Sequence, residues 1–243
     1  MAGNSRDRRP NVVKNASTRK KSSTPILIAV AVIGASLLAY AATRKPAADA
    51  TVAEGPAKVD PATAGPPQGY LIGKPDAPVK IEEFADFECP ACGRFATITE
   101  PDVRKRIVDA GLASLTFYDF PLPQHKNSQP ASNAAACAND QGKFWEMHDQ
   151  LFGAQDQWNT EATDNPRPFF VKYAQNIGLD GAKFESCYDA RTHQKRIEAN
   201  LAEGERRRVN STPTFMIGGN RYPSALSYDE LKKAVDSATL ATK

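Results

Sequence analysis

A chain of 243 residues, of which 41% are hydrophobic and 24% charged, is long enough for one medium-sized domain with appendages and apolar enough to fold around a packed core. Its net charge of +3 is unevenly placed, because residues 1–21 hold seven Lys or Arg and one Asp, which leaves the rest of the chain mildly acidic. A basic tail is also typical of nucleic-acid-binding arms, but the segment that follows argues against a nucleic-acid partner.

Residues 25–42 form an uncharged apolar run directly after the basic tail 1–24. As a helix, this run spans about 27 Å, close to the hydrocarbon thickness of a bilayer. The positive charge before it places the N-terminus in the cytoplasm and sends the remainder across the membrane. Ala39-Tyr40-Ala41 resembles a signal-peptidase site, so the segment is either an uncleaved membrane anchor, which its length favours, or a cleaved signal. Both interpretations predict a domain in the periplasm or on the outer face of the cytoplasmic membrane.

Residues 43–68 are rich in Ala, Pro and Gly and predict an extended tether, because such a composition buries too little apolar surface to fold. The folded domain is expected over residues 69–243. It begins with a strand over 78–85 and a helix from Pro90 to Gly111 with a kink at Pro101, followed by a second strand over 113–119. This order predicts a βαβ unit with two parallel strands.

The next stretch, about residues 128–209, predicts a helical insertion. Apolar residues recur there at helical spacing in five segments, 131–138, 144–152, 169–177, 180–188 and 193–208. A β-hairpin is expected over 214–222 with its turn at 218–220, and a final amphipathic helix over 226–238. The predicted fold class is therefore α/β, interrupted by helices.

Cys89-Pro90-Ala91-Cys92 is the strongest chemical signal in the sequence. A Cys-x-x-Cys motif at the start of a helix places the first sulfur where backbone N–H groups and the helix dipole stabilise a thiolate. Cys92, one turn further on, can then resolve a mixed disulfide formed by Cys89. The alternatives are a plain disulfide or half of a zinc site. Zinc usually needs a second closely spaced ligand pair, and none is formed by the remaining candidates, Cys137, Cys187, His125, His148 and His193.

Several motifs in order resemble the DsbA-like branch of the thioredoxin superfamily, over about residues 69–240. They are Gly73–Val79, Phe87-Glu88-Cys89-Pro90-Ala91-Cys92, Phe120-Pro121-Leu122-Pro123-Gln124-His125, the stretch 134–149 and Thr212-Pro213-Thr214-Phe215. The resemblance implies a thioredoxin fold with a helical insertion. It also implies that Pro213 is cis and that Thr212 lies beside Cys89, in a loop that pairs with an extended substrate. An ordinary trans proline is the alternative, and Asn210-Ser211 replaces a glycine that relatives often carry there.

The resemblance further implies that Glu83, six residues before Cys89, is buried and moves protons at the cysteines. The alternative is one exposed strand carboxylate among Glu82, Glu83, Asp86 and Glu88, and a raised pKa would distinguish the two. His125 lies in a Pro-rich loop and is either close to the active site or an ordinary loop residue. Four cysteines in an oxidising compartment favour pairing Cys89–Cys92 and Cys137–Cys187, the second being a structural disulfide or a second redox pair.

The sequence therefore predicts a protein disulfide oxidoreductase that needs no cofactor or metal, acting on unfolded or reduced exported proteins. As an oxidase it would be recharged by a membrane quinone-linked partner, as the resemblance suggests. The dipeptide Pro90-Ala91 differs from the Pro-His of strongly oxidising relatives, so a reductase or isomerase, for example in cytochrome c maturation, is the second hypothesis. A non-catalytic chaperone or scaffold for exported proteins is a third.

Overall fold

The computed structural model describes residues 65–241, so the basic tail, the apolar segment 25–42 and most of the tether lie outside the described residues. Within 65–241, no helix is both long and apolar enough to cross a bilayer. The anchor or signal function of segment 25–42 stays a prediction from the sequence.

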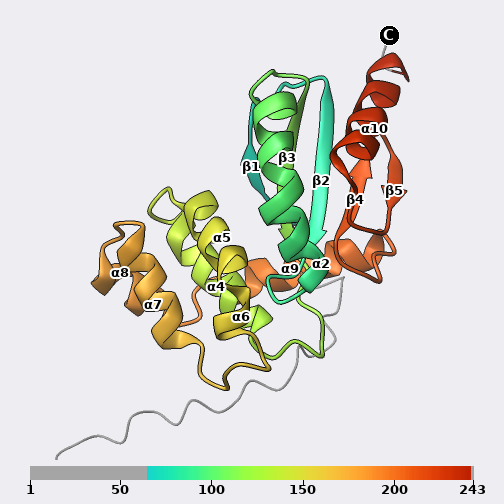
Figure 1. The fold of residues 1–243 in the computed structure, drawn as a ribbon. Coiled ribbons are helices and arrows are strands. Elements are labelled where there is room, and N and C mark those ends of the chain that lie inside the picture. Colours follow the sequence, from blue (N-terminus) through green and yellow to red (C-terminus); the bar gives the residue numbers. More distant parts are fainter. Residues whose placement is uncertain (1–64, 242–243) are drawn as a thin grey trace, which may run out of the picture. The chain divides into compact units, whose positions relative to one another are not determined.

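A five-stranded sheet forms the centre of the domain, in the strand order β1-β3-β2-β4-β5 (Figure 1). The strands are β1 (Tyr70–Ile72), β2 (Val79–Ala85), β3 (Ala113–Asp119), β4 (Thr214–Ile217) and β5 (Asn220–Tyr222). β2 and β3 are parallel, as the βαβ pattern predicts, and the other neighbouring pairs are antiparallel. The middle strand of the sheet, β2, is thus the one that carries Glu83 and leads into Cys89.

A helical segment from Pro90 to Val108 connects β2 to β3 and changes type along its length. It consists of α2 (Pro90–Arg94), the π-helical η1 (Phe95–Thr99), α3 (Glu100–Val103) and the π-helical η2 (Arg104–Val108). Pro101 has no N–H to bond back to Thr97, so the expected kink takes the form of wider turns on both sides of α3. Gly111 ends the segment with a φ of +72°, which favours glycine.

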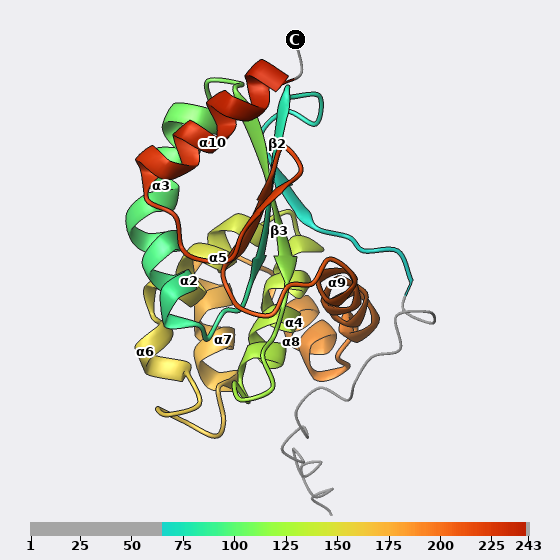
Figure 2. The ribbon, with the colours of Figure 1, turned by 90° about the vertical axis from the view of Figure 1, so that its right-hand side faces the viewer.

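Most helices lie between β3 and β4, where the sequence predicts the insertion. They are α4 (Ser128–Asn139), α5 (Phe144–Gly153), α6 (Gln155–Trp158), α7 (Arg167–Asn176), α8 (Gly181–Asp189) and α9 (Gln194–Arg206), and α10 (Tyr228–Ala241) follows the hairpin. In Figure 1, α4 to α8 gather to one side of the sheet, and we call them the helical region. Figure 2 shows α10 and α9 on opposite faces of the sheet.

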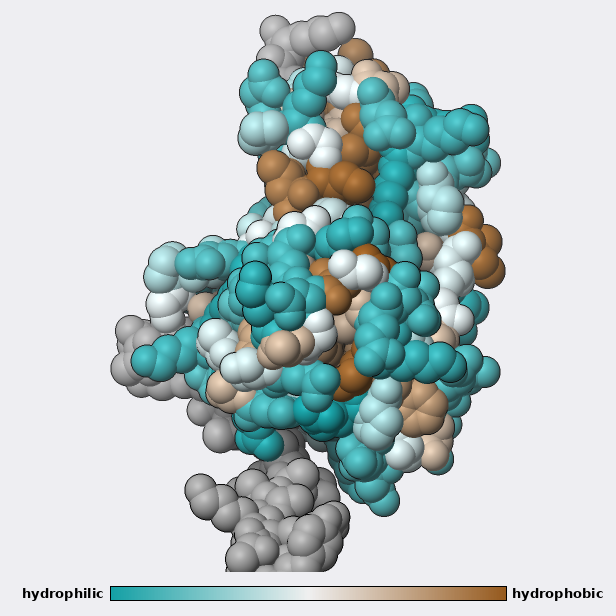
Figure 3. All heavy atoms as spheres, turned by 90° about the vertical axis from the view of Figure 1, so that its left-hand side faces the viewer, coloured by the Kyte–Doolittle hydropathy of each residue, from teal (hydrophilic) through white to brown (hydrophobic). Residues whose placement is uncertain are grey.

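Strand alternation along β2 divides the core between these layers. Ile81 packs in a cluster with Phe95 and Leu231, under α3 and α10, whereas Phe84 points to the other face and packs with Leu201 of α9. A third cluster fills the helical region around α4, whose alanines let neighbouring helices approach closely. The outer face of the helical region is mostly hydrophilic, with apolar side chains in separate patches (Figure 3).

Two short elements differ from the expected ones. β1 has three residues and α6 has four, too few for either to show a hydrophobic period, and neither was expected. β1 exists because it pairs with β3, with Tyr70 opposite Phe117, a contact between residues far apart in the chain.

Candidate active site

Cys89 lies at the N-cap of α2, directly after the strand β2 ends. Its backbone is still extended (φ −68°, ψ 121°), and its carbonyl accepts the first helical hydrogen bond from the Gly93 N–H at 3.0 Å. Pro90 occupies the first turn, where its missing N–H removes nothing from the helix. Cys89 and Cys92 are free thiols, and both residues are buried, Cys89 at 7% exposure and Cys92 at 0%.

The loop before β4, which contains Thr212 and Pro213, contacts Cys89 although it lies far from it in the sequence. The Thr212–Pro213 peptide bond is cis, as the resemblance implies. The Cys89 thiol donates to the Thr212 carbonyl oxygen at 3.3 Å, although the two residues are 123 positions apart. The Thr212 hydroxyl is buried and has no hydrogen-bond partner within residues 65–241, which leaves it able to donate to a Cys89 thiolate. The structure therefore brings Cys89, Cys92, Thr212 and Pro213 together.

The two thiols differ strongly in acidity. The pKa of Cys89 is lowered to about 6, first by a hydrogen bond from the Cys92 thiol, and further by the Thr212 side chain and the backbone N–H groups of Cys92 and Ala91, while burial opposes the shift. The pKa of Cys92 is raised well above its usual value, mainly by burial and then by the neighbouring Cys89. Since the thiolate is the nucleophilic form of a cysteine, Cys89 is the better nucleophile of the two sulfurs.

Glu83 is buried on β2, at 2% exposure, and its Oε2 has no hydrogen-bond partner in the part of the chain that the structure describes. Burial raises its pKa well above the usual value, and the charges of Glu100 and Cys89 raise it further, while Arg104 opposes them. Its charge in turn raises the pKa of Cys92. Glu83 thus has the properties expected of a buried proton carrier, rather than those of an exposed strand carboxylate.

Asp86 and Glu88, for which the sequence left an exposed position as an alternative, are also buried, and they bind the segment before Cys89 to its neighbours. The Asp86 carboxylate accepts hydrogen bonds from the backbone N–H of Glu88 and of Leu122, both at 2.8 Å, and from the His125 Nδ1 at 2.7 Å. Glu88 accepts from the backbone N–H of Asn127 at 2.6 Å and from that of Thr160. In the sequence, only the position of Asp86 and Glu88 directly before Cys89 indicates this role.

His125 lies close to the active site, because its charge interacts with Cys89 as well as with Asp86. The hydrogen bond to Asp86 raises the pKa of His125, while partial burial opposes the rise. The sequence left open whether this histidine is an ordinary loop residue, and the structure shows that Asp86, three residues before Cys89, binds both His125 and the backbone of Leu122 in this loop.

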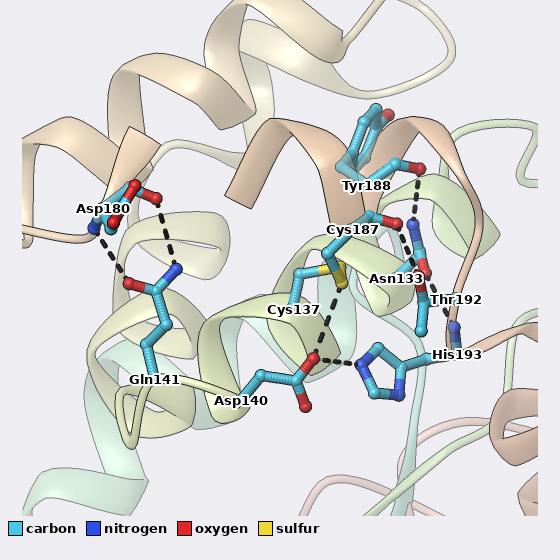
Figure 4. Close-up of a disulfide and its surroundings, with 9 residues drawn as sticks. All are labelled: Asn133, Cys137, Asp140, Gln141, Asp180, Cys187, Tyr188, Thr192 and His193. Carbon is cyan, nitrogen blue, oxygen red and sulfur yellow. Dashed lines mark hydrogen bonds and ion pairs between the residues drawn. A yellow bond between two sulfur atoms is a disulfide. The ribbon is translucent and has the colours of Figure 1, made fainter. Parts of the chain in front are cut away.

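Cys137 and Cys187 form a disulfide that joins α4 to α8 in the helical region, with 5.8 Å between their Cα atoms (Figure 4). Beside it, the His193 Nε2 donates to the Asp140 Oδ2 at 2.8 Å, and that carboxylate oxygen lies 3.7 Å from the Cys187 sulfur. Among residues 65–241, Cys137, Cys187 and His193 are the one group with the spacing of metal ligands, and two of its three ligand atoms are bonded to each other.

Comparison with known proteins agrees with this geometry. A family model described as thioredoxin matches residues 66–237. A Na(+)/H(+) antiporter NhaA 3 of Salinispora tropica is 35% identical over 175 residues, which are 71% of this chain and 25% of the antiporter, so the chain spans about a quarter of that relative's length. A probable disulfide bond formation protein D of Bacillus anthracis is 26% identical over 166 residues, 68% of this chain and 76% of that protein.

Solved structures share the fold. BdbD from Bacillus subtilis, in its oxidised form, has a TM-score of 0.64 at 22% identity and covers 73% of this chain and 97% of its own. DsbA from Chlamydia trachomatis has a TM-score of 0.63 at 22% identity, covering 76% and 98%. A thioredoxin-like oxidoreductase from Silicibacter pomeroyi is 27% identical with a TM-score of 0.59, covering 70% and 91%. The chain therefore belongs to the thioredoxin family, and its fold is that of the DsbA-like disulfide oxidoreductases.

Proposed function

We propose that the protein is an extracytoplasmic thiol-disulfide oxidoreductase that introduces disulfides into exported proteins through Cys89 and Cys92. The observation that carries the proposal is the pairing of Cys89, which is 7% exposed and has its pKa lowered to about 6, with a fully buried Cys92 whose pKa is raised. A low pKa makes Cys89 a good leaving group, and a stable Cys89 thiolate favours the reduced form of the pair, which drives the oxidation of substrates.

The chemistry is two thiol-disulfide exchanges. A substrate thiolate attacks the Cys89 sulfur of the Cys89–Cys92 disulfide, and the electron pair of the broken S–S bond goes to the Cys92 sulfur, which takes up a proton from Glu83. A second substrate thiolate then attacks the substrate sulfur of the mixed disulfide, and Cys89 leaves as a thiolate. No cofactor is needed, because the protein disulfide itself accepts the two electrons.

The loop at Thr212 is where we place the substrate. Its carbonyl oxygen lies 3.3 Å from the Cys89 sulfur, and backbone groups at such a position pair with an extended peptide segment. Reduced or unfolded exported proteins supply such segments. A membrane quinone-linked partner would reoxidise the pair after each cycle.

An oxidising compartment is supported by the Cys137–Cys187 disulfide, because structural disulfides persist outside the reducing cytosol. The apolar segment 25–42 would deliver the domain there, as an anchor or as a cleaved signal.

The reduction potential of the Cys89–Cys92 pair tests the direction of electron flow. The Cys89 pKa of about 6 lies between the values of about 7 for thioredoxin and about 3.5 for DsbA, so we expect a potential between about −270 and −120 mV. Equilibration of the full chain with glutathione, followed by alkylation and mass spectrometry, measures it. A value near −120 mV supports the oxidase, and a value near −270 mV overturns it.

A reductase or isomerase, for example one that acts in cytochrome c maturation, is the second candidate. Ala91 favours it, because the strongly oxidising relatives carry at this position a histidine that stabilises the thiolate. A non-catalytic chaperone or scaffold would keep its function in Cys89→Ala, whereas both redox functions would be lost in that variant.

A further inference from the structure

A buried polar cluster continues from Glu83 towards the surface on the side of α3 and α5. Ile81, two residues before Glu83 on β2, packs against Phe95 and Val103, so strand alternation directs the Glu83 side chain to the same helices. Glu100 on α3 and His148 on α5 lie there, both at 0% exposure. No function was predicted from the sequence for Glu100, and His148 was considered only as a zinc ligand.

Three atoms in this cluster are buried and have no hydrogen-bond partner among the described residues. They are the Glu83 Oε2, the Glu100 Oε2 and the His148 Nε2. Buried polar atoms in folded proteins are nearly always paired with protein or with ordered water, so these three atoms need a reason. The Glu100 Oε2 lies 3.6 Å from the His148 Nε2, and the charge of Glu100 is, after burial, the largest cause of the raised pKa of Glu83.

His148 connects this buried cluster to solvent. Its Nδ1 lies 2.9 Å from the Asp149 Oδ1, and the Asp149 side chain is 54% exposed. The Nδ1 also lies 3.2 Å from the Arg104 Nη2, which only donates hydrogen bonds, whereas the Asp149 carboxylate only accepts them. The shorter contact, to Asp149, assigns the proton to Nδ1, and in that tautomer the Nε2 is an acceptor facing Glu100. The ring is held in place by contacts with Phe87, Phe117, Phe144, Trp145 and Phe152.

Arg104 fixes the geometry of both acids. It binds the Glu100 Oε1 at 2.6 Å and the Asp149 Oδ1 at 2.9 Å, which leaves the Glu100 Oε2 turned to His148. The ion pair with Arg104 accounts for the burial of the Glu100 Oε1. It does not account for the Glu100 Oε2, which is buried beside the His148 Nε2 with no hydrogen-bond partner among the described residues.

We propose that Glu100, His148 and Asp149 are positioning residues that pass protons between Glu83 and solvent, a proposal that rests on the redox function above. When Cys92 attacks a mixed disulfide on Cys89, the Cys89–Cys92 bond forms, the bond to the departing thiolate breaks, and the electron pair leaves with that thiolate. The Cys92 proton goes to the Glu83 carboxylate. It then passes by way of Glu100 to the His148 Nε2, and the Nδ1 proton goes to Asp149 and water. In the reverse reaction the protons run inward.

The test uses the reduced full chain and glutathione disulfide, followed by acid quench and mass spectrometry between pH 5 and 9. The first step, in which Cys89 acquires glutathione, depends on Cys89. The second, in which Cys92 releases glutathione, depends on the loss of the Cys92 proton. We expect Glu100→Gln to slow the second step by about tenfold or more, since a general acid or base contributes about 10²–10⁴-fold and a residue acting through it contributes part of that. The rate of the first step in Glu100→Gln should stay within about twofold of the wild-type rate.

The pH profile separates a proton route from a structural role. Because the negative charge of Glu100 raises the pKa of Glu83, Glu100→Gln should move the midpoint of the second step to lower pH. The groups that share this environment are Cys89, Cys92, Arg104, His148 and Asp149, which Glu100→Gln leaves in place. Asp102→Asn is the matched control, on the same helix with an exposed side chain, and should leave both steps and the midpoint unchanged.

The outcomes are distinguishable. A Glu100→Gln protein that releases glutathione at the wild-type rate and with the wild-type profile overturns the proton route alone. A wild-type chain that never forms the Cys89–Cys92 disulfide overturns the redox function itself. Should Glu100→Gln fail to fold by circular dichroism, the half-exposed Asp149→Asn carries the test, and a second step unchanged in that variant overturns the route.

Discussion

Two regions of the protein, the start of α2 and the helical region, each contain a pair of cysteines, and the two pairs lie at opposite ends of their helices. Cys89 is at the N-terminus of α2, where the helix dipole favours a thiolate. Cys137 and Cys187 lie in the last turns of α4 and α8, where the dipole disfavours one, and the Asp140 carboxylate is 3.7 Å from the Cys187 sulfur. We therefore expect the cysteine pair at the start of α2 to be reactive and the pair in the last turns of α4 and α8 to be inert, because of their positions on the helices.

Removing the reactive sulfur should have the largest effect on chemistry. Cys89→Ser is expected to reduce disulfide exchange to the uncatalysed background, because the nucleophilic thiolate is lost. At pH 5, below the Cys89 pKa of about 6, it should leave the free energy of unfolding of the reduced protein nearly unchanged. Oxidation of a dithiol peptide and a denaturant titration measure the two quantities. Cys92→Ser is the companion, expected to accumulate the mixed disulfide on Cys89. A Cys89→Ser protein with residual turnover would contradict the assignment.

Removing the Cys137–Cys187 disulfide should have the opposite effect, on stability rather than on disulfide exchange. The double variant Cys137→Ser/Cys187→Ser is expected to keep the exchange rate at Cys89 and to lose about 4 kcal/mol of unfolding free energy on the chain-entropy model, because the disulfide closes a loop between residues 50 positions apart. Urea unfolding of both proteins gives the difference. Loss of exchange in a folded double variant would mean that the second disulfide takes part in electron transfer.

The pH dependence of the two pairs should also differ. Alkylation of Cys89 by iodoacetamide in the reduced protein is expected to rise with a midpoint near pH 6, whereas Cys137 and Cys187 react only after unfolding. Because the folded pKa of Cys89 lies below its unfolded value of about 8.5, its thiolate stabilises the reduced protein fully above pH 8.5, and this contribution is lost as the pH falls through 6. Unfolding of the reduced chain at a series of pH values checks the sign, and a Cys89 midpoint near 8.5 would contradict the expectation.

The smallest expected effect comes from Thr212. Its side chain lowers the pKa of Cys89, so Thr212→Val should raise that pKa, though by less than the loss of the Cys92 hydrogen bond would. Thiolate absorbance during a pH titration measures the shift. Thr192→Val in the helical region, whose hydroxyl bonds the Cys187 carbonyl, is the control and should leave the Cys89 pKa unchanged.

The sequence was sufficient to predict features that depend on residues close together in the chain. The strands β2 and β3, the motif at the start of α2 and the Gly218-Gly219 hairpin turn each depend on neighbouring residues, and each was predicted. The burial of Glu100 and His148 could not be predicted, because it arises only when α5 packs against the segment 90–108. The same holds for Asp86, whose partners Leu122 and His125 come from a loop more than thirty positions away.

The order of the four cysteines along the chain also has a consequence for biogenesis. The pairs Cys89–Cys92 and Cys137–Cys187 follow one another and are neither nested nor interleaved. A chain that emerges from its N-terminus presents Cys89 and Cys92 together, and at about 5–20 residues per second Cys187 follows Cys137 within about 3–10 s. Sequential oxidation of thiols in their order of appearance therefore yields the native pairing, so that this protein can mature without an isomerase to correct it.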